Sequence, residues 1–134
     1  MISAAQLLMI EEAAAAAEGR REMRCQLAMA DIYKAAGLLP PGLEIPNGDR
    51  NWAKSQGRSL IKDWLEQSPF FVLVPPPAQP GDLLCFRLGH TPHHVAIQLA
   101  GGRMVHVFSE HGVRIAPAIP TPWAKRIDSI WRLA

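Results

Sequence analysis

The feature that most constrains the fold is a change of pattern near the middle of this 134-residue chain. The first half carries alanine-rich and amphipathic stretches with the three- and four-residue spacing of helices. The second half, from the proline run at 75–77 onward, carries short apolar segments separated by glycine and proline. Helices followed by strands are typical of the α+β class. We therefore expect N-terminal helices packed on an antiparallel sheet of about five strands, in a single domain over residues 1–134.

Three helices are expected in the first half, over residues 3–18, 25–36 and 58–67. A loop is expected over residues 44–57. Gly19 and Gly37 are suitable helix stops. Five strands are expected in the second half, over residues 83–88, 94–99, 103–108, 113–116 and 127–133. Gly101 and Gly102 predict a tight hairpin turn, and a further turn is expected around Trp123. The divisions of the chain are then an N-terminal helix at 1–19, a helical half at 25–67 and a sheet half at 81–134.

Composition and charge exclude several classes of protein. With 49% hydrophobic and 19% charged residues, the chain is globular rather than disordered. A net charge of +2 and the lack of aromatic-basic interleaving argue against nucleic-acid binding. The apolar start at 1–10 has no positive leader and is interrupted by Glu11 and Glu12, and no apolar run approaches ~18 residues. We therefore expect neither a signal peptide nor a membrane span, and synthesis in the cytoplasm.

Cys25 and two histidines form the candidate reactive set. Cys25 lies at the predicted start of a helix, where the dipole and free N–H groups lower a thiol pKa and bind an oxyanion. A thiol becomes a strong nucleophile when a base takes its proton and a third group orients the base. His94 opens one predicted strand and His106 lies on the next. Pairing around the hairpin turn would put His106 one cross-strand diagonal from His94, as an orienting role requires.

Simpler interpretations stay open for the same residues. A cysteine on an apolar helix face often serves as a small buried hydrophobe, and a single strand histidine is often structural. Cys85 lies inside an apolar strand and is predicted to be a core residue, with both cysteines present as thiols. The five histidines offer metal ligands, but neither paired Cys/His spacing nor a His-Glu-x-x-His sequence occurs. No metal or cofactor site is therefore expected.

Three ordered blocks resemble the NlpC-type cell-wall peptidases, which are papain-like cysteine hydrolases. The blocks are Pro-Gly-Asp-Leu-Leu-Cys-Phe at 80–86, His-Val-Ala-Ile-Gln-Leu at 94–99 and Gly-Arg-Met-Val-His at 102–106. The similarity extends over about residues 20–133 and is closest to a phage-tail branch, in which a tryptophan and basic residues, as at 123–126, precede the last strand. The resemblance implies a papain-like α+β fold.

The resemblance also implies a role for each candidate residue. Cys25 would be the nucleophile, His94 the general base and His106 the third, orienting residue. The family block begins at the histidine before Val-Ala-Ile, which favours His94 over its neighbour at 93. The histidines at 90 and 111 would then be surface loop residues.

The implied activity is hydrolysis of an amide bond in a peptidoglycan stem peptide through a thiol acyl-enzyme, by a protein of phage or prophage origin. Peptidoglycan or its stem peptides, and phage-tail proteins, are the implied partners. The implied location is a virion tail or, after delivery, the cell wall.

The family usually has Asp or Asn before the cysteine and a small residue after it, whereas Arg24 and Gln26 flank Cys25 here. This departure motivates an alternative, a catalytically inactive member that serves as an interaction module of a phage tail or secretion machine. Acyl transfer to an amine or alcohol is a third hypothesis.

Overall fold

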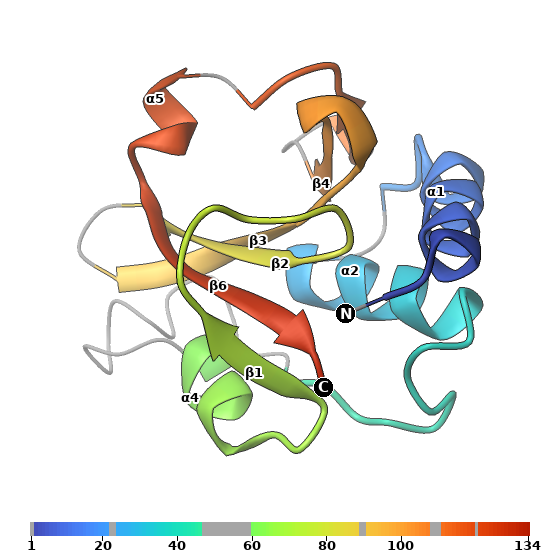
Figure 1. Ribbon diagram of the computed structural model, residues 1–134, viewed down its shortest axis with the longest axis horizontal. Helices are drawn as coiled ribbons and strands as arrows, with labels where there is room; N and C mark the ends of the chain where they lie inside the picture. Colours follow the sequence, from blue (N-terminus) through green and yellow to red (C-terminus); the bar gives the residue numbers. More distant parts are fainter. Residues whose placement is uncertain (1, 22–23, 47–59, 89–90, 108–110, 120) are drawn as a thin grey trace.

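The computed structural model describes residues 2–21, 24–46, 60–88, 91–107, 111–119 and 121–134 (Figure 1). The elements in these ranges are α1 (Ala4–Ala17), α2 (Cys25–Ala35), α4 (Leu60–Gln67), β1 (Phe71–Val74), β2 (Leu83–Leu88), β3 (Thr91–Gln98), the 3-10 turn η1 (Ala100–Gly102), β4 (Met104–Val107), β5 (Val113–Ala116), α5 (Thr121–Ala124) and β6 (Ile127–Leu133). None of the helices described is long and apolar enough to cross a bilayer.

The first helix is fixed by both of its ends. The Ser3 hydroxyl accepts the N–H of Gln6 at 3.1 Å, and the Gln6 side chain accepts the N–H of Ser3 at 2.8 Å, which is a reciprocal capping box. Past the other end, Gly19 has a φ of 92° and its N–H donates to the Val113 carbonyl at 2.8 Å. The prediction for this helix is confirmed to within one residue at each end.

The other two predicted helices are also present. The second ends at Ala35, one residue before the predicted end. The third is described from Leu60 onward and ends at the predicted Gln67. Most of the predicted loop at 44–57 and the first two residues of the predicted helix at 58–67 lie outside the described residues.

Six strands form one antiparallel sheet in the order β1-β6-β2-β3-β4-β5. Five of them are predicted by the sequence, and β1 is not. It is an edge strand of four residues that pairs with β6, with Phe71 opposite Leu133 and Val74 opposite Ile130. Four residues between a helix and a proline run are too few for alternation of apolar and polar residues to indicate a strand.

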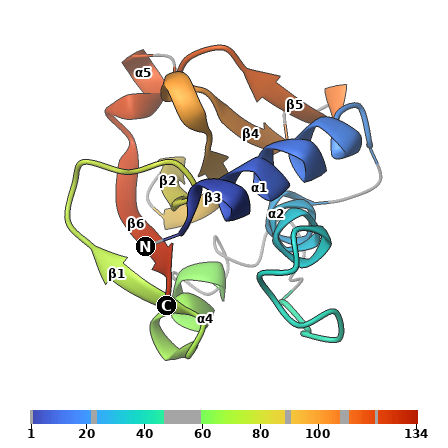
Figure 2. The same ribbon diagram turned by 45° about the vertical axis from the view of Figure 1, so that its right-hand side comes forward.

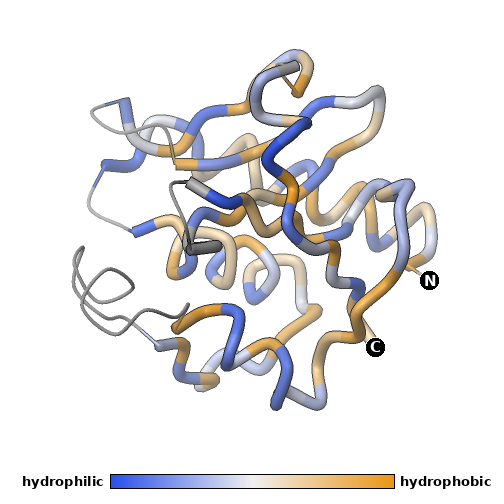
Figure 3. The backbone as a smooth tube through the Cα atoms, turned by 90° about the vertical axis from the view of Figure 1, so that its left-hand side faces the viewer, coloured by the Kyte–Doolittle hydropathy of each residue, from blue (hydrophilic) through white to orange (hydrophobic). Residues whose placement is uncertain are grey.

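Two cores pack on the two faces of the sheet. α1 and α2 lie side by side over one face, with α4 beside β1 (Figures 1 and 2). The helix-side core comprises Val95, Ile97 and Val105 of the sheet together with the apolar faces of these helices. The α5-side core comprises the alternate strand residues, with Trp123 packed on it: Leu84, Phe86, Ala96, Met104 and Ile130. Colouring by hydropathy shows apolar residues recurring along the helices and strands, interrupted by polar ones (Figure 3).

The pairing of β3 with β4 follows the predicted register. Ala96 lies opposite His106, and the Leu99 N–H donates to the Arg103 carbonyl at 2.8 Å across the turn. Gly101 and Gly102 take φ values of 72° and 74°, which side chains with a Cβ rarely adopt.

The start of β3 differs from the prediction. The strand begins at Thr91 rather than at His94, because its pairing with β2 continues past an irregularity between Phe86 and Arg87. His94 is therefore an interior strand residue opposite Phe86, and not the residue that opens the strand.

Candidate active site

Cys25 is the first residue of α2. Arg24 precedes it in an extended conformation, with φ −74° and ψ 160°, and makes no side-chain cap. The first N–H groups of the helix are thus not used by a capping side chain, and they point toward the region of the thiol. Cys25 is half-buried and packs against the helix-side core.

Opposing effects act on the pKa of the Cys25 thiol. Burial raises the pKa above its ordinary value, and this effect is the largest. Hydrogen bonds from the N–H groups of Val95, Gln26 and Cys25 itself lower it, as does the charge of Arg24. The expectation of a lowered pKa is therefore wrong for the resting protein, since burial penalises the thiolate more than the donors favour it.

His94 and His106 lie together, as the register predicts. Their ring centroids are 5.6 Å apart and their planes nearly perpendicular, at 87°. Both side chains are buried. Burial lowers the pKa of His106 below its ordinary value and so favours the neutral imidazole.

An aromatic side chain from α5 covers the histidine pair. The Trp123 ring centroid lies 5.0 Å from that of His94 and 5.5 Å from that of His106. Phe86 contacts both Trp123 and His94, at 5.4 Å and 5.9 Å. The pair thus packs against the α5-side core, and both imidazoles are buried. Sequence reasoning placed Trp123 only in a turn, because no local pattern indicates a contact made through the tertiary fold.

Cys25 packs against the helix-side core, whereas the imidazoles of His94 and His106 pack against Trp123 on the α5 side of the sheet. The backbone of β3 at residues 94 and 95 links the two groups. The Val95 N–H that bonds the Cys25 sulfur belongs to the peptide unit that follows His94. Proton transfer from Cys25 to His94 stays a prediction, and so does the orienting role of His106. What the arrangement offers chemically is a thiol among backbone donors, with buried imidazoles on the adjoining strands.

Cys85 and the other histidines are not part of this arrangement. Cys85 is fully buried in β2, as predicted for a core residue, and burial raises its pKa to about 12. His111 is exposed, whereas His90 and the side chain of His93 are not among the described parts. Within the described ranges, no group of three or more His, Cys, Asp or Glu residues is arranged to hold a metal ion.

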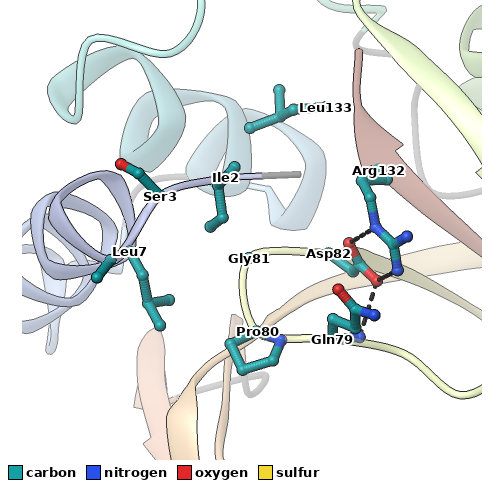
Figure 4. Close-up of a pocket in the computed structure, with 10 residues that line it drawn as sticks. Ile2, Ser3, Leu7, Gln79, Pro80, Gly81, Asp82, Arg132 and Leu133 are labelled. Atoms are coloured by element: carbon teal, nitrogen blue, oxygen red, sulfur yellow. Dashed lines mark hydrogen bonds and ion pairs between the residues drawn. The ribbon is translucent and has the colours of Figure 1, made fainter.

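A separate cavity of about 170 Å³ lies between the start of α1, the turn before β2 and the end of β6 (Figure 4). Asp82 and Arg132 face each other in its wall, and none of the three candidate residues lines it. The cavity therefore does not belong to the candidate active site.

The fold and the site define a papain-like α+β protein with a thiol at a helix N-terminus. The NlpC/P60 family model matches residues 42–132, which is more than half of the chain, and the chain therefore belongs to the NlpC/P60 family. This family is generally one of cell-wall hydrolases that act on peptidoglycan. The matched range holds His94 and His106 but begins after Cys25.

Comparison with solved structures supports the same fold. A Staphylococcus aureus protein described as similar to lipoprotein, NLP/P60 family, matches with a TM-score of 0.59 and 19% identity, over 98% of this chain and 42% of that chain. The chain thus spans less than half the length of that protein. Among curated proteins, none matches the chain.

Proposed function

We propose that this chain is a cysteine peptidase or amidase that hydrolyses amide bonds in peptidoglycan stem peptides. The observation that carries the proposal is Cys25 at the start of α2, bonded by the Val95 N–H beside the buried pair His94 and His106. Membership of the NlpC/P60 family supports the substrate class.

The proposed reaction proceeds through a thioester. His94 takes the Cys25 proton, and the sulfur attacks the amide carbonyl to form a carbon–sulfur bond. Backbone N–H groups at the start of α2 stabilise the oxyanion. The carbon–nitrogen bond then breaks as His94 returns the proton to the leaving amine, and a water molecule, deprotonated by His94, releases the acid and regenerates the thiol. His106 orients the His94 ring in this scheme.

Purified peptidoglycan fragments provide the test. Wild type should release new amine and acid termini, and Cys25→Ala should lose this activity by several orders of magnitude. Cys85→Ala is the matched control, because it removes the other thiol and leaves Cys25 in place. Equal activity of wild type and Cys25→Ala, or no activity of wild type on any stem peptide, would contradict the proposal. Product masses distinguish hydrolysis from acyl transfer to an amine or alcohol.

A second candidate is an inactive family member that serves as an interaction module. Two observations favour it: burial raises the Cys25 pKa, and the family match begins after that residue. Thiol alkylation near neutral pH separates the two candidates. If His94 activates Cys25, His94→Ala should slow the alkylation of Cys25, whereas a structural thiol should react at the same rate with or without His94.

We infer a phage or prophage origin because the tryptophan and basic residues at 123–126, before the last strand, resemble those of a phage-tail branch of the family. A virion tail or secretion machine would then bring the protein to the wall. Co-purification of the chain with tail proteins from induced cells would test this origin.

A further inference from the structure

Gln26 contacts the thiol directly. The Cys25 Sγ lies 3.4 Å from Gln26 Oε1, with the thiol as donor, and Gln26 Nε2 donates to the Pro46 carbonyl at 3.2 Å. The side chain therefore connects the start of α2 to the backbone at Pro46.

The Pro46 contact determines which end of the amide faces the sulfur. A carbonyl oxygen can only accept a hydrogen bond, so the NH₂ group of Gln26 must point at Pro46. The amide oxygen is then left facing Cys25. An acceptor beside a thiol favours the protonated form, because the same oxygen would repel a thiolate.

The other groups around the sulfur act in different directions. The N–H groups of Val95, Gln26 and Cys25 favour the thiolate, as does the charge of Arg24 on the same helix. From the sheet, Cys85 of β2 is a second thiol close enough to interact electrostatically with Cys25, and His94 of β3 adjoins Val95. In contrast to these groups, the amide oxygen of Gln26 is a side-chain acceptor 3.4 Å from the sulfur.

We propose that Gln26 is a positioning residue that holds Cys25 as a protonated thiol in the resting protein. A catalytic role for Gln26 rests on the proposed function. Its effect on the protonation of the Cys25 thiol can be measured without a substrate. Activation then requires the amide oxygen to leave the sulfur, which breaks the contact with the Pro46 carbonyl or rotates the side chain away. The residue after the cysteine thereby sets how readily the thiol ionises.

The rate of Cys25 alkylation by iodoacetamide, measured from about pH 5 to about pH 10, tests this inference. Gln26→Met keeps the side-chain length and removes the acceptor, so the midpoint should fall by about half a unit and the rate at pH ~7 should rise roughly threefold. Gln26→Glu places a carboxylate there and should raise the midpoint. Subtracting the rate of Cys25→Ala removes any reaction of Cys85.

Gln98→Ala is the matched control, because Gln98 also bonds a carbonyl, that of Ala78, from a site away from the thiol. Its alkylation midpoint should equal that of wild type. An unchanged midpoint in both Gln26 variants, with native circular dichroism, would overturn the proposal. So would a shift of equal size in Gln98→Ala. Since peptidoglycan cleavage is not measured, an inactive protein would still give a clear result on Gln26.

Discussion

At the scale of single residues, the candidate site is governed by burial. Cys25 is half-buried and both imidazoles are buried, and burial disfavours the charged form of a titratable group. Burial raises the pKa of Cys25 and lowers that of His106, so burial favours a neutral thiol and a neutral imidazole. The imidazole whose neutral form is favoured in this way is that of His106, the residue proposed to orient His94.

His106 should make the stability of the protein depend on pH. Because burial lowers its pKa below 6.5, the folded protein binds fewer protons than the unfolded chain at mildly acidic pH. The free energy of unfolding should therefore fall as the pH decreases through about 6.5, and fall less in His106→Gln, which cannot titrate. Urea unfolding at pH ~7.5 and pH ~5.5 measures how far the free energy of unfolding falls in wild type and in His106→Gln. The exposed His111, changed to Gln, is the control. Equal declines in wild type and His106→Gln would contradict the prediction.

At the scale of elements, the sequence predicted most of the secondary structure and the neighbourhood of the two histidines. Gly101 and Gly102 mark the turn, so the register of β3 with β4 follows from counting residues on either side. The pKa of Cys25 could not be predicted in this way. A helix N-terminus indicates a lowered value, but the depth of burial depends on how the helix-side core closes over the sulfur. The contact of Gln26 with Pro46 likewise depends on a segment 20 residues away.

Asp128 connects three elements. Its side chain is 4% exposed and forms ion pairs with Lys62 of α4 and Arg87 of β2, each at 2.7 Å. Burial alone would raise the pKa of Asp128, but the hydrogen bonds from Lys62 and Arg87 outweigh it and lower the pKa. The carboxylate therefore joins α4 and β2 to the first residues of β6.

Replacing this carboxylate should destabilise the protein. Asp128→Asn removes the negative charge that Lys62 and Arg87 share. The expected loss is about 2 kcal/mol, below the usual cost for a buried pair because both cations are partly exposed. Asp31→Asn is the matched control, since the Arg20–Asp31 pair is 42% and 45% exposed and should contribute less than about 1 kcal/mol. Urea unfolding at neutral pH compares the two. Equal losses would show that burial of Asp128 does not strengthen its ion pairs.

At the scale of the whole molecule, the turn before β2 is where α1, α2 and the sheet meet. Gly81 has a φ of 94°, its carbonyl accepts the Tyr33 hydroxyl of α2 at 2.8 Å, and its N–H donates to the Gln98 carbonyl of β3 at 2.7 Å. The neighbouring Asp82 is bonded at 2.9 and 2.8 Å by the guanidinium of Arg132 in β6. The Pro-Gly-Asp block therefore holds the helices against the sheet.

Gly81 and Gly19 allow the packing at this junction to be measured separately from backbone strain. Both have φ near 90°, at 94° and 92°, so an alanine at either position should cost about 1–2 kcal/mol for the left-handed backbone. A Cβ at Gly19 meets nothing within 4 Å, whereas one at Gly81 would overlap Ile2 and lie 3.6 Å from Ile10. Gly81→Ala should therefore lose about 1 kcal/mol more than Gly19→Ala in urea unfolding. Adding Ile2→Ala should recover that excess in Gly81→Ala and recover nothing in Gly19→Ala. Equal losses in the two single variants would mean that α1 shifts freely at this point and does not pack tightly against the turn.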